Sequence, residues 1–95
     1  MEEGKKNFPT AKLAGKQILA ARGLAGLKQA ELAEAADVSE MTINNIETGK
    51  VRPHLKTLER IREVLEARGI EFTNGDGIGV RLRFRAGEDS VNSAT

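Results

Sequence analysis

The chain has 95 residues and no cysteine, and its 15 Lys and Arg residues nearly balance 14 Asp and Glu residues, for a formal net charge of +1. This length fits a single globular domain, and the lack of cysteine excludes disulfides, thiolate catalysis and cysteine-ligated metal sites. With three Phe and no Tyr or Trp, the chain also lacks the aromatic side chains on which single-stranded nucleic acids stack.

The first nine residues are predicted to be a flexible leader. They are followed by a helix over residues 11–22, for which Thr10 is the predicted N-cap and Gly23 the predicted end. No apolar run approaches the roughly 18–20 residues of a membrane span, and no signal-peptide pattern follows the first methionine. We therefore expect a cytoplasmic protein without a membrane partner.

Three further helices are expected before residue 69. Strong helix formers fill residues 28–36, and a third helix begins after Ser39 as its N-cap and ends at Gly49. Residues 55–68 form the clearest amphipathic segment. Its apolar face consists of Leu58, Ile61, Val64 and Leu65.

Beyond Gly69 the apolar period changes from that of a helix to that of a strand. Residues 70–73 alternate with a period of two, and residues 74–77 contain the hairpin dipeptides Asn-Gly and Asp-Gly. Residues 79–85 then alternate apolar side chains with arginine. The pattern predicts a β-hairpin over residues 70–85, followed by a flexible tail over residues 86–95.

Residues 29–49 have the layout of a helix-turn-helix unit, with a short helix, a tight turn and a second short helix. Ala33 lies where the two helices are expected to cross closely, which requires a small side chain. The expected apolar interior between the helices consists of Leu32, Val38, Ile43 and Ile46. The spacing of these positions, with Glu47 and Gly49 after them, favours a helix-turn-helix domain over residues 10–69.

These residues resemble the Cro/CI-type (XRE-like) helix-turn-helix family, which has the lambda-repressor-like fold. The resemblance covers about residues 11–66 and rests on Gln29-Ala30-Glu31-Leu32-Ala33, Val38-Ser39, Ile43 and Ile46-Glu47-Thr48-Gly49-Lys50. One departure is Asp37, at a turn position where the family usually has glycine because φ is positive there. The resemblance implies a mainly α fold, a bundle of about four helices, to which this chain adds the C-terminal hairpin.

The resemblance also implies that residues 39–47 form a recognition helix that enters the major groove of DNA. Its base-facing side chains would be Ser39, Glu40, Met41, Thr42, Asn44 and Asn45. Asparagine can pair with adenine, glutamate can accept from the cytosine amino group, and Met and Thr methyls can contact the thymine methyl.

Phosphate contacts are expected at the margins of the motif, where they supply most of the salt-dependent affinity. The residues assigned to them are Lys28, Gln29, Lys50 and Arg52. In the family this glutamine bonds a phosphate and braces the recognition helix. Arg22 and Glu47 resemble the family's partly buried ion pair between the first helix and the end of the recognition helix.

The hairpin needs a packing partner, because a lone two-stranded hairpin is marginal in water. Val80, Leu82 and Phe84 share one face, which suits packing on the last helix. The same residues could instead form a dimer interface by extending a sheet across a two-fold axis. A two-fold axis is the symmetry that a protein needs to bind palindromic DNA. The sequence leaves both arrangements open.

We expect a regulator of transcription that binds double-stranded DNA, acts as a repressor and works as a homodimer. The alternative is an antitoxin that binds operator DNA and neutralises a protein toxin. A module of a larger enzyme complex also stays open. No enzyme is expected, because the single His and the absence of Cys leave no convergent catalytic set. No metal, cofactor or small-molecule ligand is expected either.

Overall fold

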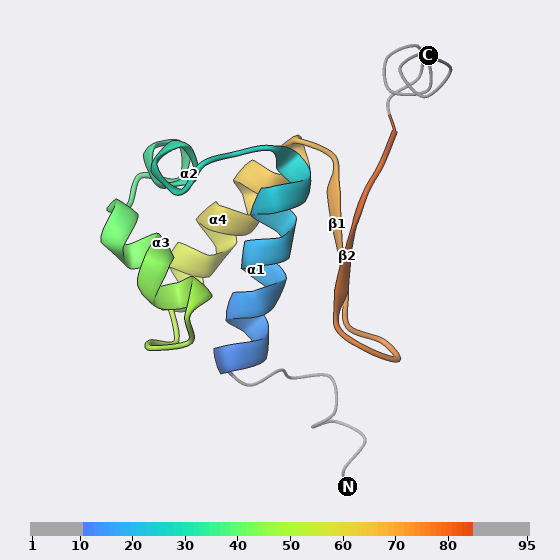
Figure 1. The fold of residues 1–95 in the computed structure, drawn as a ribbon, viewed down its shortest axis with the longest axis horizontal. Helices are drawn as coiled ribbons and strands as arrows, with labels where there is room; N and C mark the ends of the chain where they lie inside the picture. Colours follow the sequence, from blue (N-terminus) through green and yellow to red (C-terminus); the bar gives the residue numbers. More distant parts are fainter. Residues whose placement is uncertain (1–10, 85–95) are drawn as a thin grey trace, which may run out of the picture.

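A computed structural model of the chain describes residues 11–84, apart from the side chains of residues 11–13. It contains four helices and one antiparallel hairpin (Figure 1). In chain order these are α1 (Ala11–Ala25), α2 (Gln29–Ala36), α3 (Glu40–Glu47), α4 (Leu55–Ala67), β1 (Ile70–Thr73) and β2 (Gly79–Leu82). The predicted mainly α bundle with a C-terminal hairpin is confirmed. Thr10, the leader and the tail lie outside the described residues.

One apolar core joins the four helices to the first strand. Its buried side chains come from every helix and from Ile70 of β1. They are Ile18, Ala21, Leu32, Ala33, Ala36, Ile43, Ile46, Ile61, Leu65 and Ile70. The predicted interior of the helix-turn-helix is confirmed, with Val38 partly buried at its edge. The apolar face predicted for α4 also packs on this core.

The turn between α2 and α3 has the geometry that the sequence requires. Asp37 adopts the left-handed conformation, with φ 61° and ψ 46°, as the α2 C-cap. This confirms that a non-glycine residue holds a positive φ there. Val38 N–H then donates to Ala33 O at 2.9 Å, and the Ser39 hydroxyl accepts from Thr42 N–H at 3.0 Å as the N-cap of α3.

Helix α1 is longer than predicted and ends at Ala25 instead of before Gly23. Gly23 is accommodated within the helix, and a Cβ there would meet nothing within 4 Å. The glycine that ends the helix is Gly26, which has φ 75° and donates to Gly23 O at 3.1 Å. A glycine alone does not stop a helix; the backbone must also leave the helical region.

Helices α1 and α3 pack very closely at Gly15. A Cβ on Gly15 would lie 2.1 Å from the carbonyl oxygen of Ile46 and 3.0 Å from that of Glu47. The bare Cα therefore allows α1 to rest directly on the backbone at the end of α3. This contact fixes the position of α3 relative to the rest of the bundle.

The hairpin pairs Ile70 with Leu82 and Phe72 with Val80. Its apolar face packs on the helices, with β2 mainly against α1 and β1 against both α1 and α4. Strand β2 thus lies mainly against α1, and Val80 and Leu82 pack on the shared core, to which the last helix also contributes. Figure 1 shows the hairpin on the opposite side of α1 from α2 and α3.

The end of the predicted strand also differs from the structure. Strand β2 ends at Leu82, and Phe84 is 73% exposed, so it does not pack on the molecule's own helices. Leu82 lies opposite Ile70 at the start of β1, which leaves Phe84 beyond the last strand residue that has a β1 partner. Arg85 lies outside the described residues.

Candidate nucleic-acid interface

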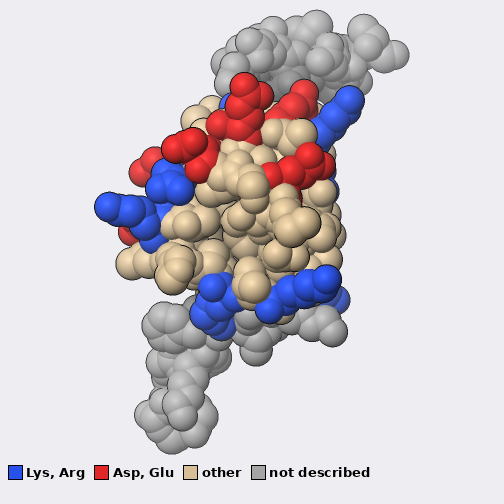
Figure 2. All heavy atoms as spheres, turned by 90° about the vertical axis from the view of Figure 1, so that its left-hand side faces the viewer, with Lys and Arg blue, Asp and Glu red and all other residues tan. Residues whose placement is uncertain are grey.

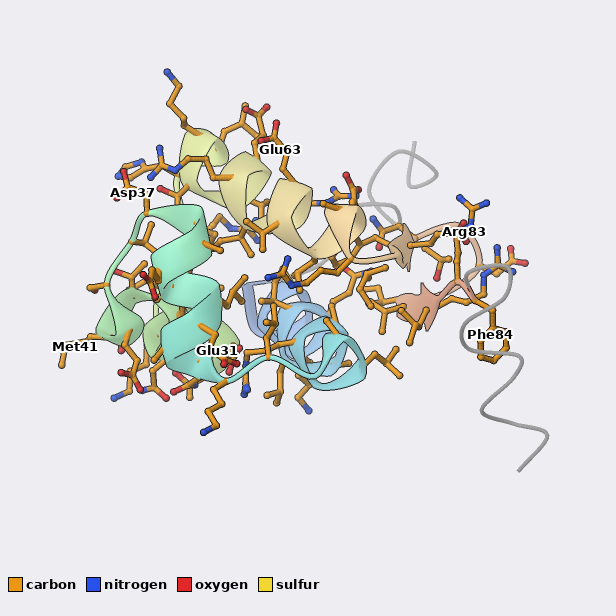
Figure 3. The ribbon with its side chains drawn as sticks, turned by 90° about the horizontal axis from the view of Figure 1, so that it is seen from above. Glu31, Asp37, Met41, Glu63, Arg83 and Phe84 are labelled. Atoms are coloured by element: carbon orange, nitrogen blue, oxygen red, sulfur yellow. The ribbon has the colours of Figure 1, made fainter. Side chains whose placement is uncertain are left out.

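The surface of α3 divides into a buried face and an open face. Ile43, Ile46 and Glu47 are buried, whereas Glu40, Met41 and Asn44 are exposed. Thr42 and Asn45 are half-buried beside them, and Ser39 is exposed at the N-cap. Met41 is 70% exposed and projects away from the molecule, at the end opposite the hairpin (Figure 3). All six side chains assigned to base contacts thus belong to one accessible surface.

Hydrogen bonds within this surface restrict what two of its side chains can present. The Thr42 hydroxyl lies 2.8 Å from the Ser39 hydroxyl, so each of these hydroxyls already has one hydrogen-bond partner within the protein. Asn44 Oδ1 lies 3.5 Å from Gln29 Nε2, which acts as its donor. The two amide hydrogens of Asn44 therefore stay available for an acceptor such as a purine N7.

A buried carboxylate ties α3 to α1 and α2. Glu47 Oε2 accepts from Arg22 Nε at 2.7 Å, and Glu47 Oε1 accepts from Arg22 Nη2 at 3.2 Å and from Gln29 Nε2 at 2.9 Å. The Glu47 side chain is only 3% exposed, and Arg22 also donates to Leu27 O at 2.9 Å. Bidentate, charge-assisted bonds of this kind hold a planar geometry. They fix the end of α3 in both position and rotation.

The glutamine at the start of α2 uses its side chain inside the protein. Both acceptors of Gln29 Nε2, on Glu47 and Asn44, belong to α3. Its amide oxygen cannot donate to a phosphate. The Lys28 N–H, just before α2, is already used, because it donates to the Glu31 carboxylate at 2.8 Å. The N–H groups of the first turn of α2 have no partner within the helix, so they are the donors that remain at its N-terminus.

Charge is unevenly distributed on the face formed by α2 and α3. Figure 2 shows that its centre carries neither sign, that basic side chains lie along the lower margin and at the left edge, and that acidic side chains predominate in the upper part. The loop that carries the exposed residues Lys50 and Arg52 lies at the lower end of this face (Figure 1). Glu31 and Glu34 are exposed on α2, at the upper end. The lower margin therefore carries the basic side chains that are suited to phosphates.

Two side chains that hold elements in place, Gln17 and Arg60, were not predicted from the sequence. Gln17 is nearly buried on α1, and its Nε2 lies within hydrogen-bond distance of Thr73 O (3.1 Å), Asn74 Oδ1 (3.2 Å) and Gly79 O (2.8 Å). It fastens the hairpin turn to α1. The available signal was its helical position between Ala14 and Ala21, on the apolar side. Arg60 Nε donates to Ala36 O at 3.0 Å and so satisfies the end of α2; no local pattern marks that role.

Metal ligands and membrane spans were sought among the described residues. Within residues 11–84, no cluster of three or more His, Asp or Glu side chains is placed to hold a metal ion. None of the helices in that range is long and apolar enough to cross a membrane.

A short helix, a tight left-handed turn and a second helix with an open polar face define a helix-turn-helix DNA-binding protein. The chain belongs to the helix-turn-helix family HTH_3, of the Cro/CI type, whose family model matches residues 18–72. The match includes the α2–α3 unit, α4 and all of β1 except its last residue. Membership implies sequence-specific DNA binding, and the family is non-catalytic. No curated protein matches the chain.

Proposed function

We propose that the protein is a transcriptional repressor that occupies a palindromic operator as a homodimer, with α3 in the major groove. The observation that carries the proposal is the division of α3 into two faces. One face is locked to α1 and α2 through Glu47, and the other presents Ser39, Glu40, Met41, Thr42, Asn44 and Asn45 to solvent. Rigid support of this kind is what base-specific contacts require.

Phosphate contacts in this proposal come from two places on either side of α3. Lys50 and Arg52 lie in the loop after α3, on the basic margin of the face. At the other place, the first backbone N–H groups of α2 bind a phosphate with the help of the helix dipole. The Gln29 side chain then supports α3 through its hydrogen bonds to Glu47 and Asn44. The phosphate contact assigned to Gln29 is made by its backbone N–H instead of its side chain.

Selection of bound sequences from random duplex DNA tests the proposal. The experiment is run at about 150 mM salt, because affinity without a stated salt concentration has no meaning. A palindromic consensus with half-sites about 34–36 Å apart is expected. Failure to enrich any sequence would contradict DNA recognition by this face and would favour a protein-binding role such as that of an antitoxin.

Two substitutions separate base contacts from phosphate contacts. Asn45→Ala is expected to relax preference at one base position by about 1–3 kcal/mol. Lys50→Ala is expected to weaken binding to all sequences and to lower the slope of log K against log salt by about 1. Normal binding by both variants would show that another surface contacts the DNA.

A further inference from the structure

The outer edge of β2 is an unpaired strand edge. Arg83 N–H donates to Gly69 O at 2.8 Å, which makes residues 69 and 83 a hydrogen-bonded pair. Because such pairs alternate in an antiparallel ladder, Val80 and Leu82 turn their N–H and C=O groups away from β1. Within residues 11–84 nothing bonds to these four groups. An open edge of this kind is a template for another strand.

Two exposed apolar side chains flank this edge symmetrically. Ile78 is 37% exposed and Phe84 is 73% exposed, and each lies three residues from Arg81. The side chains of Phe84 and Arg83 point in opposite directions (Figure 3). If β2 pairs antiparallel with a second β2 about an axis at Arg81, Ile78 of each copy lies opposite Phe84 of the other. The same register sets Val80 opposite Leu82, with their outward N–H and C=O groups facing each other.

The carboxylate of Glu71 offsets part of the charge repulsion in this register. Arg81 would face its own copy across the axis, and like charges directly opposite one another normally destabilise a sheet. However, Arg81 donates to Glu71 Oε1 through Nε at 2.9 Å, and Arg83 Nε lies 3.1 Å from Glu71 Oε2. The Glu71 carboxylate, which Arg81 shares with Arg83, therefore lowers the repulsion between the two copies of Arg81 without removing it. Gly79, which would lie opposite the second copy's Arg83, offers that side chain room.

The edge of β1 offers a second copy much less apolar surface. Ile70 is buried and Phe72 is half-buried beneath the Arg62 guanidinium, which lies 4.6 Å from the ring centroid. Among the described residues next to β1, none is a large exposed hydrophobic side chain. The groove of about 490 Å³ along this edge is rimmed by the charged groups of Glu66, Glu71 and Arg83.

The placement of the hairpin makes such a dimer compatible with DNA. Figures 1 and 3 show α2 and α3 on the far side of α1 from the hairpin, displaced roughly along the normal of the two-stranded sheet. A two-fold axis that continues the sheet is parallel to that normal. Rotation about it leaves both copies of α3 on the same side of the dimer, facing one DNA duplex.

We propose that β2 pairs antiparallel with β2 of a second copy, centred on Arg81, to form a four-stranded sheet in which Ile78 of each copy covers Phe84 of the other. This rests on the homodimer of the proposed function and specifies its interface. It depends on no property of the recognition face, so it can be tested without DNA.

Single cysteines test the register directly, because the chain has no cysteine of its own. At a central non-hydrogen-bonded pair the two Cα atoms lie about 4.5 Å apart, within the range that a disulfide spans. Arg81→Cys is therefore expected to form a disulfide-linked dimer under mild oxidation. The control is Arg83→Cys, which has a similar exposure and the same Glu71 partner. Its two copies would lie about 13 Å apart and are expected to stay unlinked.

Three outcomes of this experiment overturn the register. They are equal cross-linking by both variants, stronger cross-linking by Arg83→Cys, and no cross-linking by Arg81→Cys at concentrations where sedimentation shows a dimer. A monomeric native chain at about 100 μM would overturn the interface altogether. Monomers that still bind a single half-site would leave DNA recognition intact, whereas cross-linked dimers without sequence preference would contradict only the DNA-binding proposal.

A second variant tests the apolar contact. Phe84→Ser removes two buried phenyl groups per dimer and is expected to raise the dimer dissociation constant by at least about 100-fold. Leu55→Ser is the matched control, because Leu55 is 70% exposed on α4 and lies outside this interface. Phe84 is largely exposed in the monomer, so the fold is expected to survive, as circular dichroism will show. A dissociation constant that changes less than about threefold in Phe84→Ser would contradict the proposal.

Discussion

Replacing Gly15 with alanine tests the close approach of α1 to the recognition helix. The new Cβ would lie 2.1 Å from Ile46 O, about 1 Å inside the 3.0 Å limit below which real Cβ atoms essentially never approach a neighbour. Both neighbouring atoms of α3, Ile46 O and Glu47 O, belong to the backbone, so no side-chain rotation relieves the clash. The two helices must separate, and the contacts of Ile43 and Ile46 with the core must loosen with them.

The expected cost follows from two opposing effects. Alanine is favoured over glycine inside a helix by about 0.5–1 kcal/mol. Overpacking of a filled interior costs about 1–3 kcal/mol or more, and contact with rigid backbone places Gly15→Ala at the upper end of that range. The net loss is therefore about 2 kcal/mol of unfolding free energy. For a domain of this size it lowers Tm by about 8–16 °C.

The same helix provides a matched control. Gly23 also lies inside α1, and a Cβ there would meet nothing within 4 Å. Gly23→Ala is expected to gain the helix preference without a clash and to raise Tm by about 2–8 °C. Thermal and urea unfolding, followed by circular dichroism, measure both variants. If Gly15→Ala proves as stable as Gly23→Ala, the proposed role of Gly15 in seating α3 is wrong.

Three other predictions concern the turn, the buried ion pair and the hairpin. Asp37→Gly is expected to raise the unfolding free energy by about 0.5–1 kcal/mol, because glycine adopts a positive φ without strain. Urea unfolding measures this, and an Asp37→Ala variant as stable as Asp37→Gly would contradict the explanation. Glu47→Ala is expected to cost about 3–5 kcal/mol because it leaves the Arg22 charge partly buried without its carboxylate. The double variant Arg22→Met with Glu47→Leu should cost much less, and equal losses in urea unfolding would refute the pairing. Gln17→Leu is expected to cost about 1–3 kcal/mol and to raise amide exchange in residues 73–79, whereas unchanged exchange would show that Gln17 does not hold the hairpin.

Much of the fold follows from patterns that are local in sequence. Ser39 caps α3 because its hydroxyl reaches an N–H three residues ahead, and Asn-Gly and Asp-Gly turns lie between two alternating segments. The spacing from Gln29 to Gly49 was enough to indicate the helix-turn-helix, and the family resemblance implied which side chains form its open face. The predicted end of α1 was wrong, because the presence of a glycine at position 23 does not determine its backbone φ.

Which elements meet, and how closely, depends on the packing of the whole domain. The sequence was enough to predict the order and type of the elements, since caps, turns and apolar periods act over a few residues. It did not determine that β2 lies on α1, that Gln17 bonds the hairpin turn, or that Gly15 touches the backbone of α3. These contacts join residues about 30 to 60 positions apart, and their existence depends on how every helix packs at once. The same packing leaves Phe84 exposed at an open strand edge, because Leu82 is the last β2 residue with a partner on β1.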